Sequence, residues 1–233
     1  MAVVVDEPRL REKLYVFEDR FHAGEVLAQK LREYEKKENT LILAIPAGGV
    51  QVASVVAHKL SLPFDVAVTR KLHIPWNPEA GFGAVSWDGS VLLNERIVAA
   101  LGLTEDEIQR CIAEEKHVIA RRLKLFRGDA PFPSLSDKTV IVVDDGLASG
   151  FSMIVTAKSL EKAGASHKIV AVPTAPANAI ELLRPLVEKI VCLNTRSGPI
   201  FAVADAYRSW YDLNDDDVLK ELRKIPGMTR TEN

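Results

Sequence analysis

Short runs of aliphatic and β-branched residues alternate along the chain with segments whose apolar positions recur every three or four residues. Five runs predict strands, because each is nearly continuous in Val, Ile, Leu and Ala with little polar alternation. They are residues 41–45, 64–69, 139–143, 168–172 and 190–193. Such strands are buried on both faces, as in a parallel sheet covered by helices. The pattern therefore predicts an α/β fold with a central parallel sheet and helices on both faces.

The segments between these runs contain helix start signals. One helix is expected over residues 21–37, with Asp19 as its N-cap. A second is expected to begin near Gly49 and a third directly after Gly150. A fourth should start near Pro176, because the fixed φ of proline suits the first turn of a helix.

Residues 71–137 interrupt this alternation, since they are too many for a simple crossover between two parallel strands. The first part is rich in Pro and Gly, and we expect a loop or a mobile hairpin there. The second part predicts a long helix, which Thr104 and Glu107 open as a capping box and Gly128 ends. Four basic residues near its end are expected to form a solvated face: Arg121, Arg122, Lys124 and Arg127. We expect one domain over residues 1–233, with this insertion as a lid or an interface.

Composition narrows the class of protein. Of the 233 residues, 47% are hydrophobic and 27% charged, which is typical of a soluble globular protein. The net charge of −2 gives no electrostatic reason to expect nucleic acid or an anionic membrane as a partner. No apolar run approaches the ~20 residues of a membrane helix, and the N-terminus does not resemble a signal peptide. Cys111 and Cys192 form no disulfide framework or zinc spacing, and we expect buried thiols. A reducing, cytoplasmic setting is the expectation.

The most informative segment, residues 140–152, runs from a buried strand through two acidic residues and a loop of small residues into a helix. Gly146 and Gly150 permit backbone shapes that a Cβ would block. Consecutive N–H groups of the loop can then point inward while the helix adds its positive end. Ser149 and Ser152 can add hydroxyl donors. Together these features predict an anion site of the size of a phosphate group.

The two acidic residues, Asp144 and Asp145, follow the strand at the sheet edge where parallel α/β proteins bind ligands. A phosphate site beside two carboxylates suits a sugar phosphate, because the acids can accept hydrogen bonds from ribose hydroxyls, directly or through Mg²⁺ and water. The pattern Gly-x-x-x-x-Gly-Lys-Ser/Thr of nucleotide-binding P-loops is absent, and the spacing does not fit a dinucleotide fingerprint. The alternative is a tight turn whose acids only cap the next helix.

Residues 142–150 resemble the 5-phosphoribosyl-1-pyrophosphate (PRPP) signature of the type I phosphoribosyltransferases. Nearly the whole chain resembles a poorly characterised branch of that superfamily, through further pieces that occur in the expected order. These are Phe17-x-Asp19-Arg20 with Ala23-Gly24, Ile45-Pro46-Ala47-Gly48-Gly49-Val50, Arg70-Lys71-Leu72, Asn77-Pro78-Glu79 with Gly83-Ala84-Val85, and Ala171-Val172-Pro173 with Ala175-Pro176. The resemblance implies an enzyme. Its reaction would be Mg²⁺-dependent transfer of the 5-phosphoribosyl group of PRPP to a nitrogen acceptor, a nucleobase or related heterocycle, with release of pyrophosphate.

The resemblance also implies roles for single residues around the signature. The 5-phosphate would be bound by Gly146, Leu147, Ala148, Ser149, Gly150 and Ser152, and Pro173 is added to the substrate-binding residues. Asp144 and Asp145 would bind the ribose hydroxyls and would hold Mg²⁺ mainly indirectly, through PRPP and water.

Pyrophosphate would lie on the loop of Ala47, Gly48 and Gly49, near Arg70 and Lys71. Cations suit this place because negative charge accumulates on the leaving group as its bond breaks. Related sequences often have Arg at the position of Ala47, so this loop has one cation fewer. The alternatives are a simple strand-to-helix turn for the loop and a surface location for the basic pair.

Two further regions complete the implied site. Glu79 lies in a segment that would close over the reacting centre and exclude water, unless it is an incidental acid on a surface loop. Residues 194–233 would form a hood over the acceptor, with Tyr211 as a ring on which a flat base can stack. However, Tyr207, Trp210 and Tyr211 follow helical spacing, which favours a packed helix face for most of them. Residues 215–217, three consecutive Asp, are expected to start a helix with solvated charge.

Two other functions stay open at this point. A non-catalytic sensor of PRPP or a nucleotide would keep the phosphate loop without a working pyrophosphate site, and Ala47 favours it. A Mg²⁺-dependent phosphohydrolase could use Asp144 as nucleophile, but that chemistry usually has an Asp-x-Asp pattern, which is absent. The sequence leaves open the acceptor, the choice between enzyme and sensor, and the oligomeric state, although members of the superfamily often form homodimers.

Overall fold

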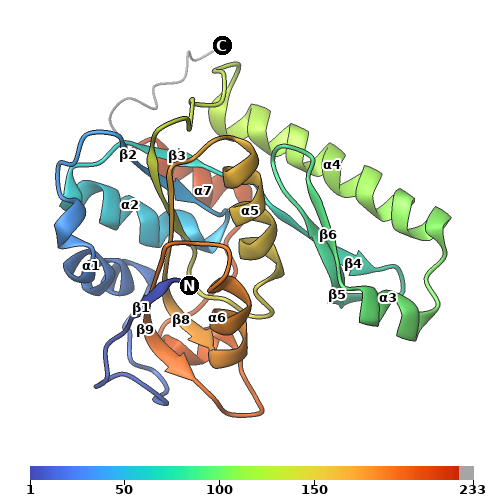
Figure 1. The fold of residues 1–233 in the computed structure, drawn as a ribbon, viewed down its shortest axis with the longest axis horizontal. Helices are drawn as coiled ribbons and strands as arrows, with labels where there is room; N and C mark the ends of the chain where they lie inside the picture. The colour runs from blue at the N-terminus through green and yellow to red at the C-terminus, as the bar shows by residue number, and fades with distance from the viewer. Residues whose placement is uncertain (226–233) are drawn as a thin grey trace.

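The computed structural model describes residues 1–225, without the side chains of Pro78 and Glu79. Its centre is a six-stranded sheet in the order β1-β9-β8-β7-β2-β3, in which every pair of neighbours is parallel (Figure 1). The strands are Val3–Val5 (β1), Thr40–Ala44 (β2), Phe64–Val66 (β3), Thr139–Val143 (β7), His167–Pro176 (β8) and Lys189–Arg196 (β9). The predicted central parallel sheet is confirmed.

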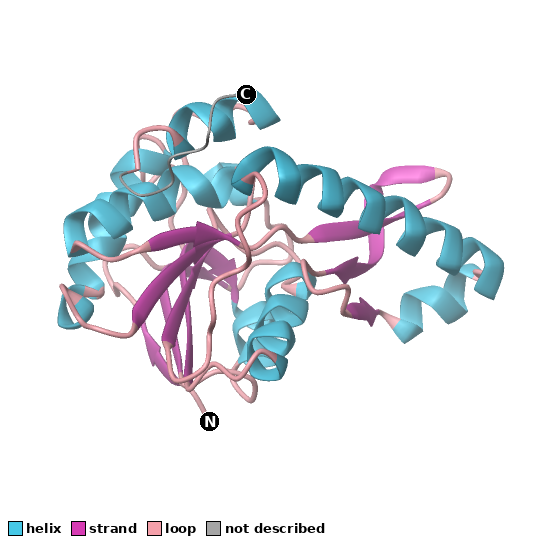
Figure 2. Ribbon diagram, turned by 90° about the horizontal axis from the view of Figure 1, so that it is seen from above, coloured by secondary structure: helices cyan, strands magenta, loops and turns pink. Residues whose placement is uncertain are grey.

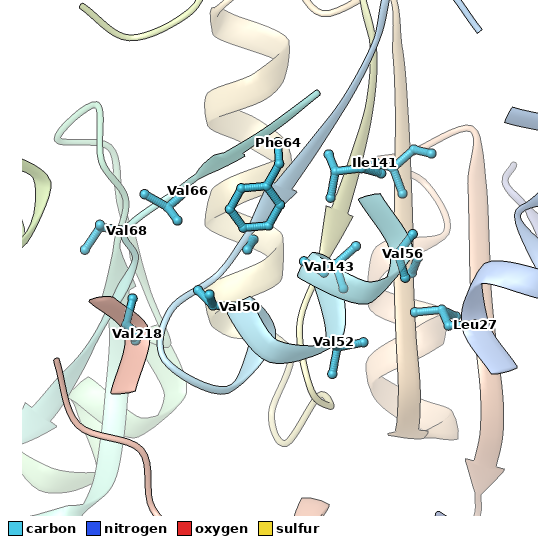
Figure 3. Close-up of a cluster of buried hydrophobic side chains, with 14 of the residues drawn as sticks. Leu27, Val50, Val52, Val56, Phe64, Val66, Val68, Ile141, Val143 and Val218 are labelled. Atoms are coloured by element: carbon cyan, nitrogen blue, oxygen red, sulfur yellow. The ribbon is translucent and has the colours of Figure 1, made fainter. Parts of the chain in front are cut away.

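Helices cover both faces of this sheet (Figure 2). Alternate residues of the central strand β7 explain why positions 140–143 are all apolar. Ile141 and Val143 pack in one cluster with Leu27 and Val56 (Figure 3), whereas Val140 and Val142 belong to a second cluster. The helices that contribute buried residues to the first cluster are α1 (Arg20–Lys30), α2 (Gly48–Leu60), α4 (Glu105–Arg127) and α7 (Asp215–Leu222), and those of the second are α5 (Phe151–Lys162) and α6 (Ala177–Leu183).

Some predicted boundaries are wrong. The edge strand β1 was not predicted, because three residues give too short a pattern. The strand expected over residues 64–69 ends at Val66. The first helix was expected to reach residue 37, but it ends at Lys30 and a 3₁₀ turn follows over Arg32–Tyr34 (η1). There the Leu31 N–H is shared between two carbonyl oxygens, a tightening that often marks the last turn of a helix.

The insertion protrudes to one side of the central sheet and is more ordered than the sequence suggested (Figure 1). It consists of a three-stranded antiparallel sheet and two helices. These elements are β4 (Arg70–Ile74), β5 (Asn77–Val85), β6 (Val91–Leu93), α3 (Glu95–Leu101) and α4 (Glu105–Arg127). Its glycines suggested a loop, yet Gly83 lies within β5, where a Cβ would come within 2.3 Å of the Leu92 carbonyl oxygen. Close strand packing therefore accounts for that glycine.

The basic residues near the end of α4 are not all solvated, contrary to expectation. Arg127 is largely buried and binds Asp65 of β3 through two hydrogen bonds of 2.8 and 2.9 Å. Arg122 forms an ion pair of 2.8 Å with Asp215 at the start of α7. These pairs join the insertion to the central domain. No helix among residues 1–225 is long and apolar enough to cross a membrane.

The capping box of α4 is confirmed and gives a first testable prediction. The Thr104 hydroxyl accepts from the Glu107 N–H at 3.3 Å, and the Glu107 carboxylate accepts from the Thr104 N–H at 2.8 Å. Thr104→Ala should lower the stability by about 1 kcal/mol, or the Tm by about 2–4 °C, without changing ligand binding at the sheet edge. Calorimetric melting checks this. Ser166→Ala, at an exposed serine outside a helix cap, is the control, and an equal Tm for both variants would contradict it.

Candidate active site

Two loops that the sequence singled out lie side by side at the carboxyl edge of the sheet. Ala44 of β2 pairs in register with Val143 of β7, so the two strands end at the same level. A Cβ on Gly48 would lie 1.8 Å from the Asp145 Oδ2, and one on Gly49 would lie 2.7 Å from the Val143 carbonyl oxygen. Only glycine lets the first turn of α2 approach the acid pair this closely. The structure thus brings the predicted pyrophosphate loop onto the predicted ribose acids.

The predicted phosphate loop connects β7 to α5 beside the same edge. The Leu147 N–H donates to the Thr174 carbonyl oxygen of β8 at 3.0 Å, which holds the buried part of the loop. Ala148 and Ser149 are exposed, and Gly150 precedes α5 with a φ of +79°, a conformation that favours glycine. The exposed residues therefore lie at the positive end of α5, as an anion site requires.

The two carboxylates lie in a poorly solvated place. Burial raises the pKa of Asp144 well above its usual value, and the neighbouring charge of Asp145 raises it further. Burial also raises the pKa of Asp145, but the charge and the hydrogen bond of Arg20 oppose this. Within the described residues, Arg20 is the cation that lowers both pKa values, so two adjacent acids share one positive charge. A ligand that supplies a cation or hydroxyl donors fits this place.

Arg20, at the start of α1, is the cation of this site. Its Nε donates to the Asp145 Oδ2 at 2.7 Å, and its Nη1 donates to the Tyr211 carbonyl oxygen at 3.0 Å. The guanidinium lies 3.8 Å from the ring centre of Trp210, and only 4% of Arg20 is exposed. In the sequence Arg20 stands out only as part of a family motif, and this role was not predicted. One signal was available: after the N-cap Asp19, a basic residue opposes the helix dipole and so needs an acidic partner.

The aromatic residues of the expected hood do not form a helix face. The short 3₁₀ helix Val203–Ala206 (η2) ends before Tyr207, and an irregular segment follows. Tyr207 is fully buried, as the packing interpretation predicted, and its hydroxyl donates to the Asp145 carbonyl oxygen at 2.5 Å. Tyr211 is half exposed, and its hydroxyl accepts from the Gln51 Nε2 at 3.2 Å. The helical spacing is coincidental, because the rings gather around Arg20 instead.

The predicted basic pair has a different location from the one expected. The core strand β3 ends at Val66, and Arg70 begins β4 of the insertion. The Arg70 Nε donates to the Glu115 Oε2 of α4 at 2.8 Å. The Lys71 side chain lies over Gly81 of the neighbouring strand. Contact of this pair with pyrophosphate stays a prediction, and the predicted role of Glu79 falls on a side chain outside the described ones.

The structure also locates Pro173 and the two cysteines. Pro173 is buried in β8, next to the Thr174 that holds the phosphate loop. Among the described residues, no group of three or more His, Cys, Asp or Glu side chains could hold a metal ion. Cys192 is fully buried, which raises the pKa of its thiol to about 12, and Cys111 is half buried.

Comparison with known proteins places this geometry in a family. A family model described as a phosphoribosyl transferase domain matches residues 18–194, which include both glycine loops and the acid pair. Two Mycobacterium tuberculosis proteins are named "Putative phosphoribosyl transferase MT0597" and "Putative phosphoribosyl transferase Rv0571c". Each is 33% identical over 207 residues, which cover 89% of this chain and 46% of the relative. The chain thus spans about half the length of these relatives.

One solved structure is similar to this chain over most of its length. The crystal structure of TT1426 from Thermus thermophilus is similar to this chain with a TM-score of 0.71 and 32% identity. The match covers 89% of this chain and 98% of that one. The fold, the two glycine loops on one acid pair and the match over residues 18–194 together show that the chain belongs to the phosphoribosyl transferase domain family.

Proposed function

We propose that this chain binds PRPP together with Mg²⁺ and transfers its 5-phosphoribosyl group to a nitrogen acceptor, a nucleobase or related heterocycle, releasing pyrophosphate. The observation that carries this proposal is the meeting of two glycine loops and one acid pair at a single sheet edge, at the starts of α2 and α5. Two anion sites separated by carboxylates match a sugar with a phosphate at one end and a pyrophosphate at the other.

Each end of PRPP has a candidate partner. The 5-phosphate would accept from the backbone N–H groups of residues 146–150 and from the hydroxyls of Ser149 and Ser152, at the positive end of α5. The ribose hydroxyls would donate to Asp144 and Asp145. Pyrophosphate would lie on Ala47, Gly48 and Gly49 at the positive end of α2. Bond cleavage in such a site depends on positioning and on charge stabilisation of the leaving group, so no nucleophilic side chain is required.

The residues present fit Mg²⁺ as an ion shared with the substrate. Mg²⁺ usually binds one or two carboxylates plus substrate phosphates and water rather than an all-protein site. Asp144 and Asp145 supply such oxygens. The cation that lowers the pKa of the half-buried Asp144 is Arg20, which is already bound to Asp145. When bound, the ion would neutralise charge on the pyrophosphate. We also propose a cytoplasmic setting, which the thiols Cys111 and Cys192 support.

A PRPP or nucleotide sensor is the second candidate. Two observations favour it: Ala47 supplies no cation to the pyrophosphate loop, and Arg70 is paired with Glu115 of α4. A sensor would bind PRPP without turnover. An enzyme would need a cation to approach the pyrophosphate during the reaction.

Titration calorimetry of PRPP with and without Mg²⁺ tests the proposal. We expect saturable binding that requires Mg²⁺, followed by pyrophosphate release when the correct base is found in a panel of purines, pyrimidines and pyridines. Binding without pyrophosphate release from any base would favour the sensor. The absence of binding at millimolar PRPP would refute the transferase and the PRPP sensor, and would leave a sensor of a nucleotide or of another phosphorylated sugar.

A further inference from the structure

We propose that Arg20 is a positioning residue of the donor site, which holds Asp145 in place and is itself held by residues 207–211. This inference rests on the proposed function, because the ligand that it concerns is PRPP. Residues 207–211 lie outside residues 18–194, the region that matches the family model. The proposal therefore gives a role in donor binding to a segment outside the matched region.

Arg20 and Asp145 form an ion pair that is largely shielded from water. The two side chains are 4% and 14% exposed, so they exchange little with water. A buried guanidinium is costly unless it is paired, and the helix dipole at the start of α1 adds to that cost. The position of Arg20 is therefore explained by Asp145 and by its other partners, and not by the stability of α1.

Arg20 is itself held in place by Trp210 and Tyr211. The Trp210 ring lies 3.8 Å from the guanidinium carbon, and the Tyr211 carbonyl oxygen accepts from the Nη1. A planar cation stacked on a ring and bound at a second edge keeps one orientation. The Tyr211 hydroxyl is fixed in turn by Gln51 of α2. Arg20 thus joins the irregular segment to the acid pair.

Three contacts restrict the movement of Asp145. Its Oδ2 is bound by Arg20, its carbonyl oxygen accepts from the Tyr207 hydroxyl, and its carboxylate lies against Gly48. A carboxylate fixed at these points presents its remaining oxygen in one place. Binding then does not have to order this side chain, and such pre-organisation raises affinity. Without Arg20 the carboxylate would be free to turn, and the binding of PRPP would have to order it.

Four variants test this role by calorimetry with PRPP and Mg²⁺. Arg20→Ala should weaken PRPP binding at least about tenfold, which corresponds to a loss of about 1.4 kcal/mol of binding free energy. Arg20→Lys should bind with intermediate affinity, because it keeps the charge but not the planar, two-edged contact. Trp210→Leu should weaken binding less than Arg20→Ala. Arg184→Ala is the matched control, because this arginine pairs with Glu181 of α6, outside residues 207–211, and that carboxylate is 65% exposed, so the variant should stay within twofold of wild type.

Two readouts separate positioning from general stability. Millimolar guanidinium chloride should restore part of the affinity of Arg20→Ala, whereas sodium chloride at the same ionic strength should not. Adding Trp210→Leu to Arg20→Ala should cause no further loss, because the ring acts through Arg20. If Arg20→Ala does not fold, as judged by circular dichroism, the affinities of Arg20→Lys and Trp210→Leu decide, and wild-type values for both would overturn the proposal.

The outcomes distinguish this inference from the proposed function. If wild-type protein binds PRPP and Arg20→Ala binds it equally well, only the positioning role is refuted. Additive losses in the double variant would also refute it, since Trp210 would then act independently of Arg20. If wild-type protein does not bind PRPP, the proposed function fails and this inference fails with it.

Discussion

Asp144→Asn is expected to abolish PRPP binding while it stabilises the fold. The loss of affinity should be at least about 100-fold, because hydrogen bonds to a charged group contribute about 1.5–3 kcal/mol each and the ribose offers two hydroxyls. The gain in stability has a separate cause. Burial and the charge of Asp145 raise the pKa of Asp144, so its ionised form destabilises the folded state at neutral pH. Removing that charge should add about 0.5–2 kcal/mol.

The pH dependence of this gain has a definite sign. An acid whose pKa is raised on folding binds more protons in the native state, so its ionisation lowers stability as the pH rises through the raised pKa. The advantage of Asp144→Asn should therefore be absent below the usual pKa of Asp, about 3.9, and should grow as the pH rises toward neutrality. Melting curves from about pH 3.5 to about pH 8, which bracket that range, check this. A Tm difference that does not change with pH would contradict the explanation.

The same change one residue later should have the opposite effect on stability. Burial raises the pKa of Asp145 as well, but Asp145→Asn, unlike Asp144→Asn, leaves the buried Arg20 without its charged partner, and breaking a buried ion pair costs about 3–5 kcal/mol. PRPP binding should be lost as well. Asp129→Asn, at a carboxylate that is 87% exposed, is the control and should change neither property. Equal Tm values for the variants at positions 144 and 145 would show that Arg20 does not distinguish the two acids.

The central sheet and the acid pair could be predicted because their signals are local. The strand Thr139–Val143 was predicted with its observed bounds, since both faces of it are buried and the acids mark its end. The antiparallel sheet of the insertion was less predictable. Its glycines serve close packing between strands, which the sequence cannot distinguish from turn formation, as at Gly83 against the Leu92 carbonyl oxygen.

The role of Arg20 could not be predicted, because its contacts are distant in sequence. Asp145 lies 125 positions away and Tyr211 lies 191 positions away. The spacing of Tyr207, Trp210 and Tyr211 pointed to a helix, but the rings converge on a guanidinium that no local pattern connects with them. Sequence patterns identify the residues that bind a ligand at a strand end more readily than the residues that hold those residues in place.

Gly48→Ala should weaken PRPP binding by displacing Asp145. The new Cβ would lie 1.8 Å from the Asp145 Oδ2, closer than atoms can approach, so one of the two groups must move. The carboxylate is the end of a side chain and can swing away, whereas the backbone of α2 is held by the helix. Asp145 would then leave Arg20, and we expect at least a tenfold loss of affinity with a loss of stability near that of Asp145→Asn. Calorimetry and melting curves measure both.

Two other glycines show whether contact with Asp145 is the cause. In Gly49→Ala the Cβ would meet the Val143 carbonyl oxygen at 2.7 Å and the Asp144 Cα at 2.9 Å. Both are backbone atoms that cannot swing away, so this variant should lose more stability than Gly48→Ala. In Gly198→Ala the nearest atom is the Ile200 carbonyl oxygen at 3.8 Å, and neither property should change. If Gly48→Ala kept wild-type affinity and stability, the site would tolerate a displaced Asp145, and the close approach of α2 to the acid pair would have no part in binding.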